Sequence, residues 1–152
     1  MKNFVNKKDT KFSLSISIIF SFFMGIICFF INNTTGLSVA YDTTLETLSI
    51  FSLTFLGFTI TSFTVFQIVH SKPWSEKIKT TNAFAELLNA FKLLIIISAC
   101  GIFVALFFRV TILILPNKWF YIMGICIATF LISFLCSFAW RTTVAIIGLF
   151  KV

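Results

Sequence analysis

The charged residues of this chain fall in short clusters, and long stretches with almost no charge separate the clusters. These stretches cover about residues 12–31, 47–69, 93–115 and 119–140. Each has roughly 20 residues, and a helix of that length, rising about 1.5 Å per residue, crosses a hydrocarbon core of about 30 Å. The pattern therefore predicts an all-α, polytopic membrane protein, in which residues 1–152 form a single domain of four transmembrane helices.

The third and fourth stretches are separated by only a few residues. Pro116 ends the third, because proline cannot continue the helical hydrogen-bond ladder, and Asn117 and Lys118 leave room for a tight turn. These two helices are expected to form an antiparallel hairpin. Trp119 and Trp140 lie about 21 residues apart, roughly one bilayer thickness, as expected for aromatic residues at the two membrane interfaces.

Lysine and arginine residues are expected on one side of the membrane. Ten of the twelve lie before the first stretch, between the second and third, and after the fourth: Lys2, Lys7, Lys8, Lys11, Lys72, Lys77, Lys79, Lys92, Arg141 and Lys151. Only Arg109 and Lys118 lie towards the other side. The connection of residues 32–46 has only the acids Asp42 and Glu46. Because cationic loops are retained in the cytoplasm, both termini are expected to be cytoplasmic.

The first stretch follows a basic start and precedes Ser38-Val39-Ala40, which is also the arrangement of a secretory signal peptide. Its apolar part is longer than the roughly 7 to 15 residues of such signals, so a retained helix is expected. The abundance of Phe, Ile, Lys and Asn is typical of an AT-rich bacterial genome. The expected location is therefore the bacterial inner membrane.

The overall composition supports the membrane interpretation. Of 152 residues, 59% are hydrophobic and 11% are charged, against roughly 25% charged in an ordinary soluble domain. The formal net charge of +7 would fit a nucleic-acid-binding protein, but the positions of the cations are those that membrane topology requires. We therefore expect lipid as a partner and no direct nucleic-acid binding.

Residue types that carry catalysis or bind metals are sparse. His70 is the single histidine, and no CxxC pair is formed by Cys28, Cys100, Cys126 and Cys136. No carboxylate lies near the middle of a stretch, where a proton relay would need it. Phosphate-binding glycine loops, nucleophile elbows and HExxH motifs are also missing. The sequence predicts a protein that is not an enzyme, with no catalytic, cofactor or metal site.

Small and hydroxyl-bearing residues recur at helical spacing inside the apolar stretches. The first contains Ser17, Ser21 and Gly25, and the fourth contains Ser133 and Ser137. The third stretch contains the small residues Ser98, Gly101 and Ala105. Small residues let helix backbones approach closely in lipid, so these stripes are expected to pack helices together.

The second stretch carries the most polar stripe, which comprises Thr47, Thr54, Gly57, Thr61 and Thr64. Two interpretations remain open. The stripe either packs inside the four-helix bundle, with each hydroxyl bonded to its own or a neighbouring helix, or lines a wet path in an oligomer. Packing is favoured, because four helices of one protomer leave little room for a pore.

Arg109 is the only charge inside the third stretch, about 17 residues and roughly 25 Å beyond Lys92. An unpaired cation at that depth is costly. We expect Arg109 either to extend outward to the interface or to form an ion pair with Glu46 or Asp42.

The connection between the second and third stretches is basic and leads into an amphipathic helix start. The residues expected at a surface there are Lys72, Trp74, Lys77, Lys79 and Lys92. Such a surface suits lipid headgroups or a cytoplasmic protein partner, with headgroups favoured.

The hydroxyl-rich second helix contains the run Leu56-Gly57-Phe58-Thr59-Ile60-Thr61-Ser62. This second helix leads through a short basic loop into the third helix, which is expected to start in the cytoplasm. In this layout the chain resembles small membrane proteins of bacterial defence islands, and it is similar to the four-helix membrane subunit of the Kiwa anti-phage system. The resemblance implies a homo-oligomeric inner-membrane component that works with a cytoplasmic DNA-binding partner. It assigns a role to no single residue.

Three functions are compatible with these features. The first is a non-catalytic inner-membrane subunit that forms homo-oligomers, engages a cytoplasmic partner through residues 70–92 and senses membrane perturbation in anti-phage defence. The second is an oligomeric pore-forming or membrane-disrupting effector built on the second-stretch stripe. A small-molecule or lipid carrier is less favoured, because neither a midplane charge nor a broken helix marks a binding site.

Overall fold

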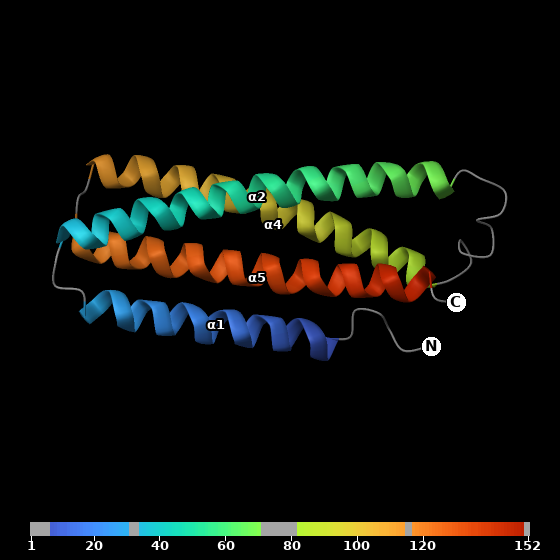
Figure 1. Cartoon of the computed structure of the whole chain (residues 1–152), viewed down its shortest axis with the longest axis horizontal. Helices are drawn as coiled ribbons and strands as arrows, with labels where there is room; N and C mark the ends of the chain where they lie inside the picture. Colours follow the sequence, from blue (N-terminus) through green and yellow to red (C-terminus); the bar gives the residue numbers. More distant parts are fainter. Residues whose placement is uncertain (1–6, 31–33, 71–81, 115–116, 151–152) are drawn as a thin grey trace.

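The computed structural model describes residues 7–30, 34–70, 82–114 and 117–150. Within these ranges the chain forms four α-helices: α1 (Lys7–Phe30), α2 (Thr34–His70), α4 (Asn82–Ile114) and α5 (Lys118–Phe150) (Figure 1). The expected all-α architecture with four long helices is therefore confirmed.

Each helix contains a segment long and apolar enough to cross a membrane. These segments are Lys11–Phe30, Thr35–Val65, Leu87–Ile114 and Lys118–Val144. Only 17% to 33% of the residues in their most apolar windows are buried inside the protomer. Most of the apolar surface therefore faces outward, as in a multi-pass membrane protein whose exterior meets lipid or other copies.

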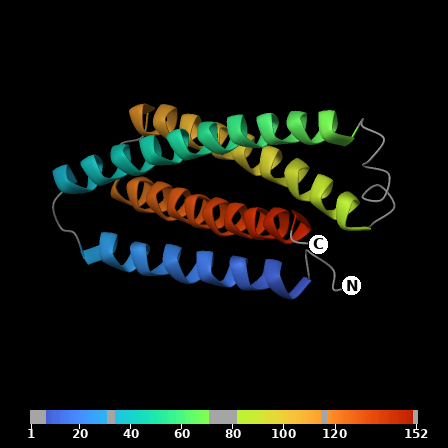
Figure 2. The ribbon, with the colours of Figure 1, turned by 45° about the vertical axis from the view of Figure 1, so that its right-hand side comes forward.

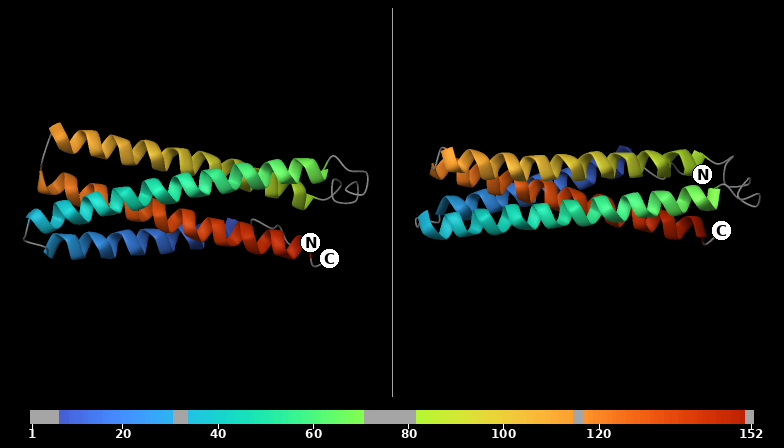
Figure 3. Two further views of the ribbon diagram at one scale, coloured as in Figure 1. Left: turned by 45° about the horizontal axis from the view of Figure 1, so that its top comes forward. Right: turned by 90° about the horizontal axis from the view of Figure 1, so that it is seen from above.

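The helices run side by side along the long axis of the molecule, and each is antiparallel to the helix before it in the chain (Figures 2 and 3). α5 packs against α1, α2 and α4, and α2 also packs against α4. α1 lies at the edge of the bundle, where its main neighbour is α5 (Figure 2). The start of α1 and the end of α5 lie at the same end of the bundle, together with the end of α2 and the start of α4 (Figure 1).

α2 begins earlier than the sequence suggested. Residues 32–46 were expected to connect two spans, but α2 starts at Thr34, so most of that connection is helical. The physical reason is tertiary burial, since Leu37, Tyr41 and Leu45 recur every four residues and are fully buried. This apolar stripe favours a helix even though charged residues interrupt the hydrophobic run.

The turn between α4 and α5 has the predicted position. α4 ends at Ile114 and α5 begins at Lys118. Asn117 caps α5: its side-chain Oδ1 accepts a hydrogen bond from the Trp119 amide at 3.3 Å, and its carbonyl oxygen accepts one from the Phe120 amide at 2.9 Å. The short connection makes these two helices an antiparallel pair, as expected.

Two clusters form the core of the bundle. The larger lies towards the α4–α5 turn and includes Cys28, Leu37, Tyr41, Leu45, Leu48, Ala105, Phe108, Ile125 and Ala128. The smaller lies towards the opposite end and comprises Ala90, Leu94, Leu135 and Phe138. Several serines and threonines are buried between the helices as well. Small side chains thus allow close helix approach, and larger ones fill the spaces between.

Candidate functional site

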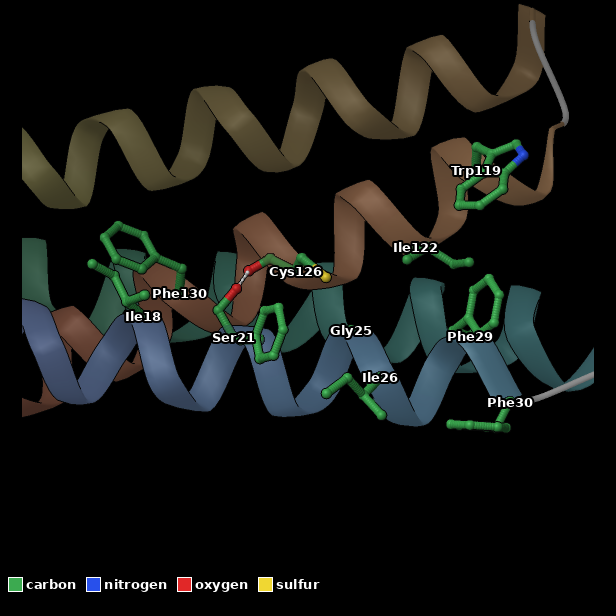
Figure 4. A pocket seen from close by; sticks show the side chains of 11 residues that line it. Ile18, Ser21, Gly25, Ile26, Phe29, Phe30, Trp119, Ile122, Cys126 and Phe130 are labelled. Atoms are coloured by element: carbon green, nitrogen blue, oxygen red, sulfur yellow. Dashed lines mark hydrogen bonds between the residues drawn. The ribbon is translucent and has the colours of Figure 1, made fainter.

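The small-residue stripe of α1 lies against α5. Ser17 is fully buried, and Ser21 donates a hydrogen bond from its hydroxyl to the Cys126 carbonyl oxygen at 2.7 Å (Figure 4). A Cβ placed on Gly25 would stand 2.9 Å from Cys126 Sγ, closer than ordinary packing allows. Gly25 therefore permits the approach of α1 to α5 at this level.

Further towards the other end of the same interface, the hydroxyls of Ser13 and Ser137 form a hydrogen bond that joins α1 to α5. Ser133, one turn along α5, is only partly buried. Arg141 lies over the ring of Phe12, with its Cζ 5.7 Å from the ring centroid. A cation–π contact thus accompanies the serine pair between these two helices.

The polar stripe of α2 faces away from the rest of the protomer. Thr54, Gly57, Thr61 and Thr64 are exposed, and Thr47 is half-buried. A Cβ added to Gly57 would meet no atom within 4 Å. The opposite face of α2, with Leu37, Tyr41, Leu45, Leu48 and Ser52, is the buried one. Packing of the stripe inside one bundle, the favoured interpretation, therefore does not describe this protomer: the larger apolar stripe occupies the inner face.

The threonine hydroxyls of this stripe are satisfied within their own helix. Thr47, Thr54 and Thr64 donate to the carbonyl oxygens of Thr43, Ile50 and Ile60 at 2.8, 2.8 and 2.9 Å. Thr61 donates in the same way to Gly57. Because each donor is bonded, the stripe can face lipid or a second helix without leaving a hydroxyl proton unpaired.

The exposed face of α2 has a seven-residue repeat. Including two exposed isoleucines, its positions alternate in steps of three and four: Thr47, Ile50, Thr54, Gly57, Thr61, Thr64 and Ile68. This spacing is that of helix pairs with a left-handed supercoil. We refer to these seven residues as the outer seam of α2.

Tyr41 joins three helices and was not singled out as a site residue from the sequence. Its hydroxyl donates a hydrogen bond to the Phe108 carbonyl oxygen of α4 at 2.6 Å. Its ring meets the ring of Tyr121 on α5 edge to face, with 5.1 Å between the centroids. It also lies over Gly124, where any Cβ would collide with the ring. The only signal in the sequence was its place in the Leu37–Leu45 stripe.

The three predicted members of an ion pair lie near this tyrosine. Arg109, Asp42 and Glu46 are all exposed, and the described residues contain no ion pair between Arg109 and either acid. Helical geometry explains the arrangement, because each of the three follows directly after a buried residue and so points about 100° away from the buried face. The extension of Arg109 to a membrane interface stays a prediction.

A second close approach joins α2 to α4. Ser98, Gly101 and Ala105 of α4 are buried, as expected for a packing face. A Cβ on Gly101 would collide with the Ser52 side chain of α2. The hydroxyls of Ser52 and Ser98 are buried without a hydrogen-bond partner. Ser52 was not identified from the sequence, because its role depends on its neighbour across the interface.

The basic connection falls mostly outside the described residues. Lys72, Trp74, Lys77 and Lys79 all lie there, so their surface stays a prediction. Lys92 lies on α4 and is exposed.

Metal-ligating side chains are not grouped in the described residues. These residues contain no group of three or more His, Cys, Asp or Glu side chains that could hold a metal ion. The four cysteines are free thiols, and Cys28 is the buried one. The features described above are therefore the helix contacts of α1, α2, α4 and α5 and the exposed face of α2.

Comparison of the chain with protein-family models, with curated proteins and with solved structures finds no match.

Proposed function

We propose that this chain is a non-catalytic subunit of a bacterial inner membrane, which crosses the bilayer four times with both termini in the cytoplasm. In this proposal, copies assemble through the outer seam of α2, and the cytoplasmic connection of residues 70–92 engages a soluble protein partner. The observation that carries the proposal is the outer seam itself, a largely exposed heptad face of four threonines, one glycine and two isoleucines, with open space over Gly57.

The contrast with the rest of the exterior supports assembly at this face. Many exposed positions elsewhere carry large apolar side chains, such as Phe22 on α1 and Phe103 on α4, which are 71% and 73% exposed. Lipid tails are as apolar as leucine, so helices in a bilayer associate mainly by close packing at small residues. A face of threonine and glycine suits a neighbouring helix better than it suits lipid.

The proposed role follows from the position of the seam on α2. α2 leads directly into the basic connection, so a change in packing between copies would move the segment that the partner contacts. In an anti-phage system, disturbance of the bilayer would shift that packing. The partner would then receive a signal without any chemistry in the membrane.

The mass of the assembly tests this proposal. In lipid nanodiscs, the wild-type chain should give a mass of several protomers, and Gly57→Leu should give mainly single protomers, because the leucine fills the space that a second helix needs. Phe58→Leu is the matched control, since Phe58 is exposed on α2 but lies off the seam. An unchanged mass for Gly57→Leu, or a wild type that is already monomeric, would contradict the assembly.

A pore-forming effector is the second candidate, and the hydroxyl groups of the same seam favour it. In a ring of copies the seam would face a central axis, and threonine side chains tolerate water there. Single cysteines at Thr54, Gly57 and Thr61 separate the two functions. Reaction with a membrane-impermeant thiol reagent supports a water-filled path, whereas protection at all three positions supports a packed seam.

A further inference from the structure

A groove runs between α1 and α5, with α2 behind the two helices in the view of Figure 4. Its volume is about 540 Å³, and it is open along one side. One wall is formed by α1 with Ile18, Phe22 and Ile26, and the other by α5 with Ile122 and Phe130. Both walls belong to segments that are apolar enough to cross a membrane.

The groove exists because the residues at which its two walls touch have small side chains. Ser21 and Gly25 form the floor with Cys126, and larger side chains at those positions would fill the space. The hydroxyl of Ser21 already donates to the Cys126 carbonyl oxygen, so the only other donor of the floor is the weakly polar Cys126 thiol. A polar ligand would lose its hydrogen bonds to water and find little replacement, whereas a hydrocarbon chain needs none.

We propose that this groove binds one acyl chain of a phospholipid from the surrounding bilayer. The inference rests on the proposed membrane location. Along α1 the lining extends from Ile18 to Phe30, which is about 18 Å of helix. One leaflet of the hydrocarbon core is roughly 15 Å deep, half of about 30 Å. The groove therefore has the length of a single acyl chain in one leaflet.

The end of the groove near the α4–α5 turn has the chemistry of a membrane interface. The rings of Phe29 and Trp119 close it, with centroids 6.2 Å apart. Tryptophan prefers the headgroup level, so the ester end of the lipid would lie beside Trp119. Lys118 directly precedes Trp119 and places a positive charge at the same end, complementary to a lipid phosphate.

A helix from a second copy is too large for this space. Over the same 18 Å, a helix about 10 Å wide occupies roughly 1,400 Å³, which exceeds the total of about 1010 Å³ of empty space in the groove and its open side together. An extended hydrocarbon chain, whose carbons pack about 4 Å from their neighbours, is narrow enough to lie inside. The groove is thus distinct in kind from the outer seam of α2.

Native mass spectrometry of the chain released from membranes in mild detergent tests the site. The wild type should retain one phospholipid per protomer. Ile122→Trp and Ile26→Trp fill the groove from opposite walls and should retain none above background. Phe103→Trp adds the same side chain at a site on α4 that is 73% exposed, and it should retain the lipid as the wild type does. The helical circular dichroism of all variants should be equal.

The headgroup part of the site is tested in the same spectra. Lys118→Gln should lower the retention of phosphatidylglycerol added to the detergent, and Lys118→Arg should preserve it, because the positive charge remains.

Three results would overturn the lipid site. The first is equal lipid retention in the filled variants and the wild type. The second is a wild type that retains no lipid. The third is loss of a dimer mass in Ile122→Trp, which would make the groove an interface between copies. Failure of the membrane proposal is distinguishable, because the chain would then be found in the soluble fraction before any detergent is added.

Discussion

α1 and α2 carry similar stripes of small residues, but the two stripes face in opposite directions. On α1, Ser17 and Gly25 lie against α5, and the exposed surface of the helix consists of large apolar side chains. On α2, Gly57 and Thr61 lie on the exterior, and the inner face consists mainly of leucines and Tyr41, with Ser52 and Thr59 buried further along. A small-residue stripe marks a place of close helix approach, but it does not tell which helix approaches.

The difference between the two helices lies in what else each one carries. The buried face of α1 contains little besides its stripe, so that stripe is the surface available to α5. α2 has a second, more apolar stripe that begins at Leu37, fills the space between α4 and α5 and turns the threonines outward. The choice of inner face therefore depends on the competition between stripes of the same helix.

The largest expected effect on the unfolding free energy comes from a substitution in the small-residue stripe of α1. Gly25→Leu should lower the free energy of unfolding in detergent by about 2 kcal/mol, because its Cβ would have to displace the Cys126 thiol, although the rest of the leucine can extend into the groove between α1 and α5. Phe23→Leu, at a position that is 60% exposed, should change it by less than about 0.5 kcal/mol. Equal effects of the two substitutions would show that α1 does not pack on α5 through its stripe.

A substitution at the inner face of α2 should have an intermediate effect on the unfolding free energy. Tyr41→Phe removes the hydroxyl that donates to the Phe108 carbonyl oxygen and should cost about 1 kcal/mol of unfolding free energy. Tyr121→Phe keeps the ring pair between these tyrosines and should cost less. Thermal or denaturant unfolding in the same detergent compares them, and the opposite ranking would place the key hydroxyl on Tyr121.

Substitutions in the outer seam should have the smallest effect on the unfolding free energy of the protomer. Gly57→Leu meets no neighbouring atom, so in dilute detergent, where copies are separated, its unfolding free energy should stay within about 0.5 kcal/mol of the wild type or rise slightly with helix propensity. The same substitution abolishes assembly in the proposal above. A loss of several kcal/mol in the separated protomer would instead mean that the seam packs within one chain.

Much of the fold could be predicted from charge spacing alone. The four helices follow from apolar stretches of membrane-crossing length, and the α4–α5 hairpin follows from Pro116 and Asn117. The start of α2 at Thr34 could not be predicted in this way, because Asp42 and Glu46 interrupt the hydrophobic run and only the burial of Leu37, Tyr41 and Leu45 reveals the helix.

The candidate site was less predictable than the fold. The stripe residues were found from their spacing, since spacing is a local property of the sequence. The direction that each stripe faces, the hydrogen bond from Tyr41 to Phe108 and the place of Ser52 opposite Gly101 depend on contacts between distant segments. A single sequence contains no direct signal of such contacts.

A pair of disulfide cross-links in cell membranes tests the opposed stripes most directly. In a chain whose Cys28, Cys100 and Cys136 are serine, Gly25→Cys should join Cys126 within one chain, because the 2.9 Å from its Cβ to Sγ is close to the roughly 3 Å of a disulfide. With Cys126 also replaced, Gly57→Cys should join two chains. The controls, Phe23→Cys and Phe58→Cys, should form neither link. A two-chain band from position 25, or none from position 57, would contradict the account.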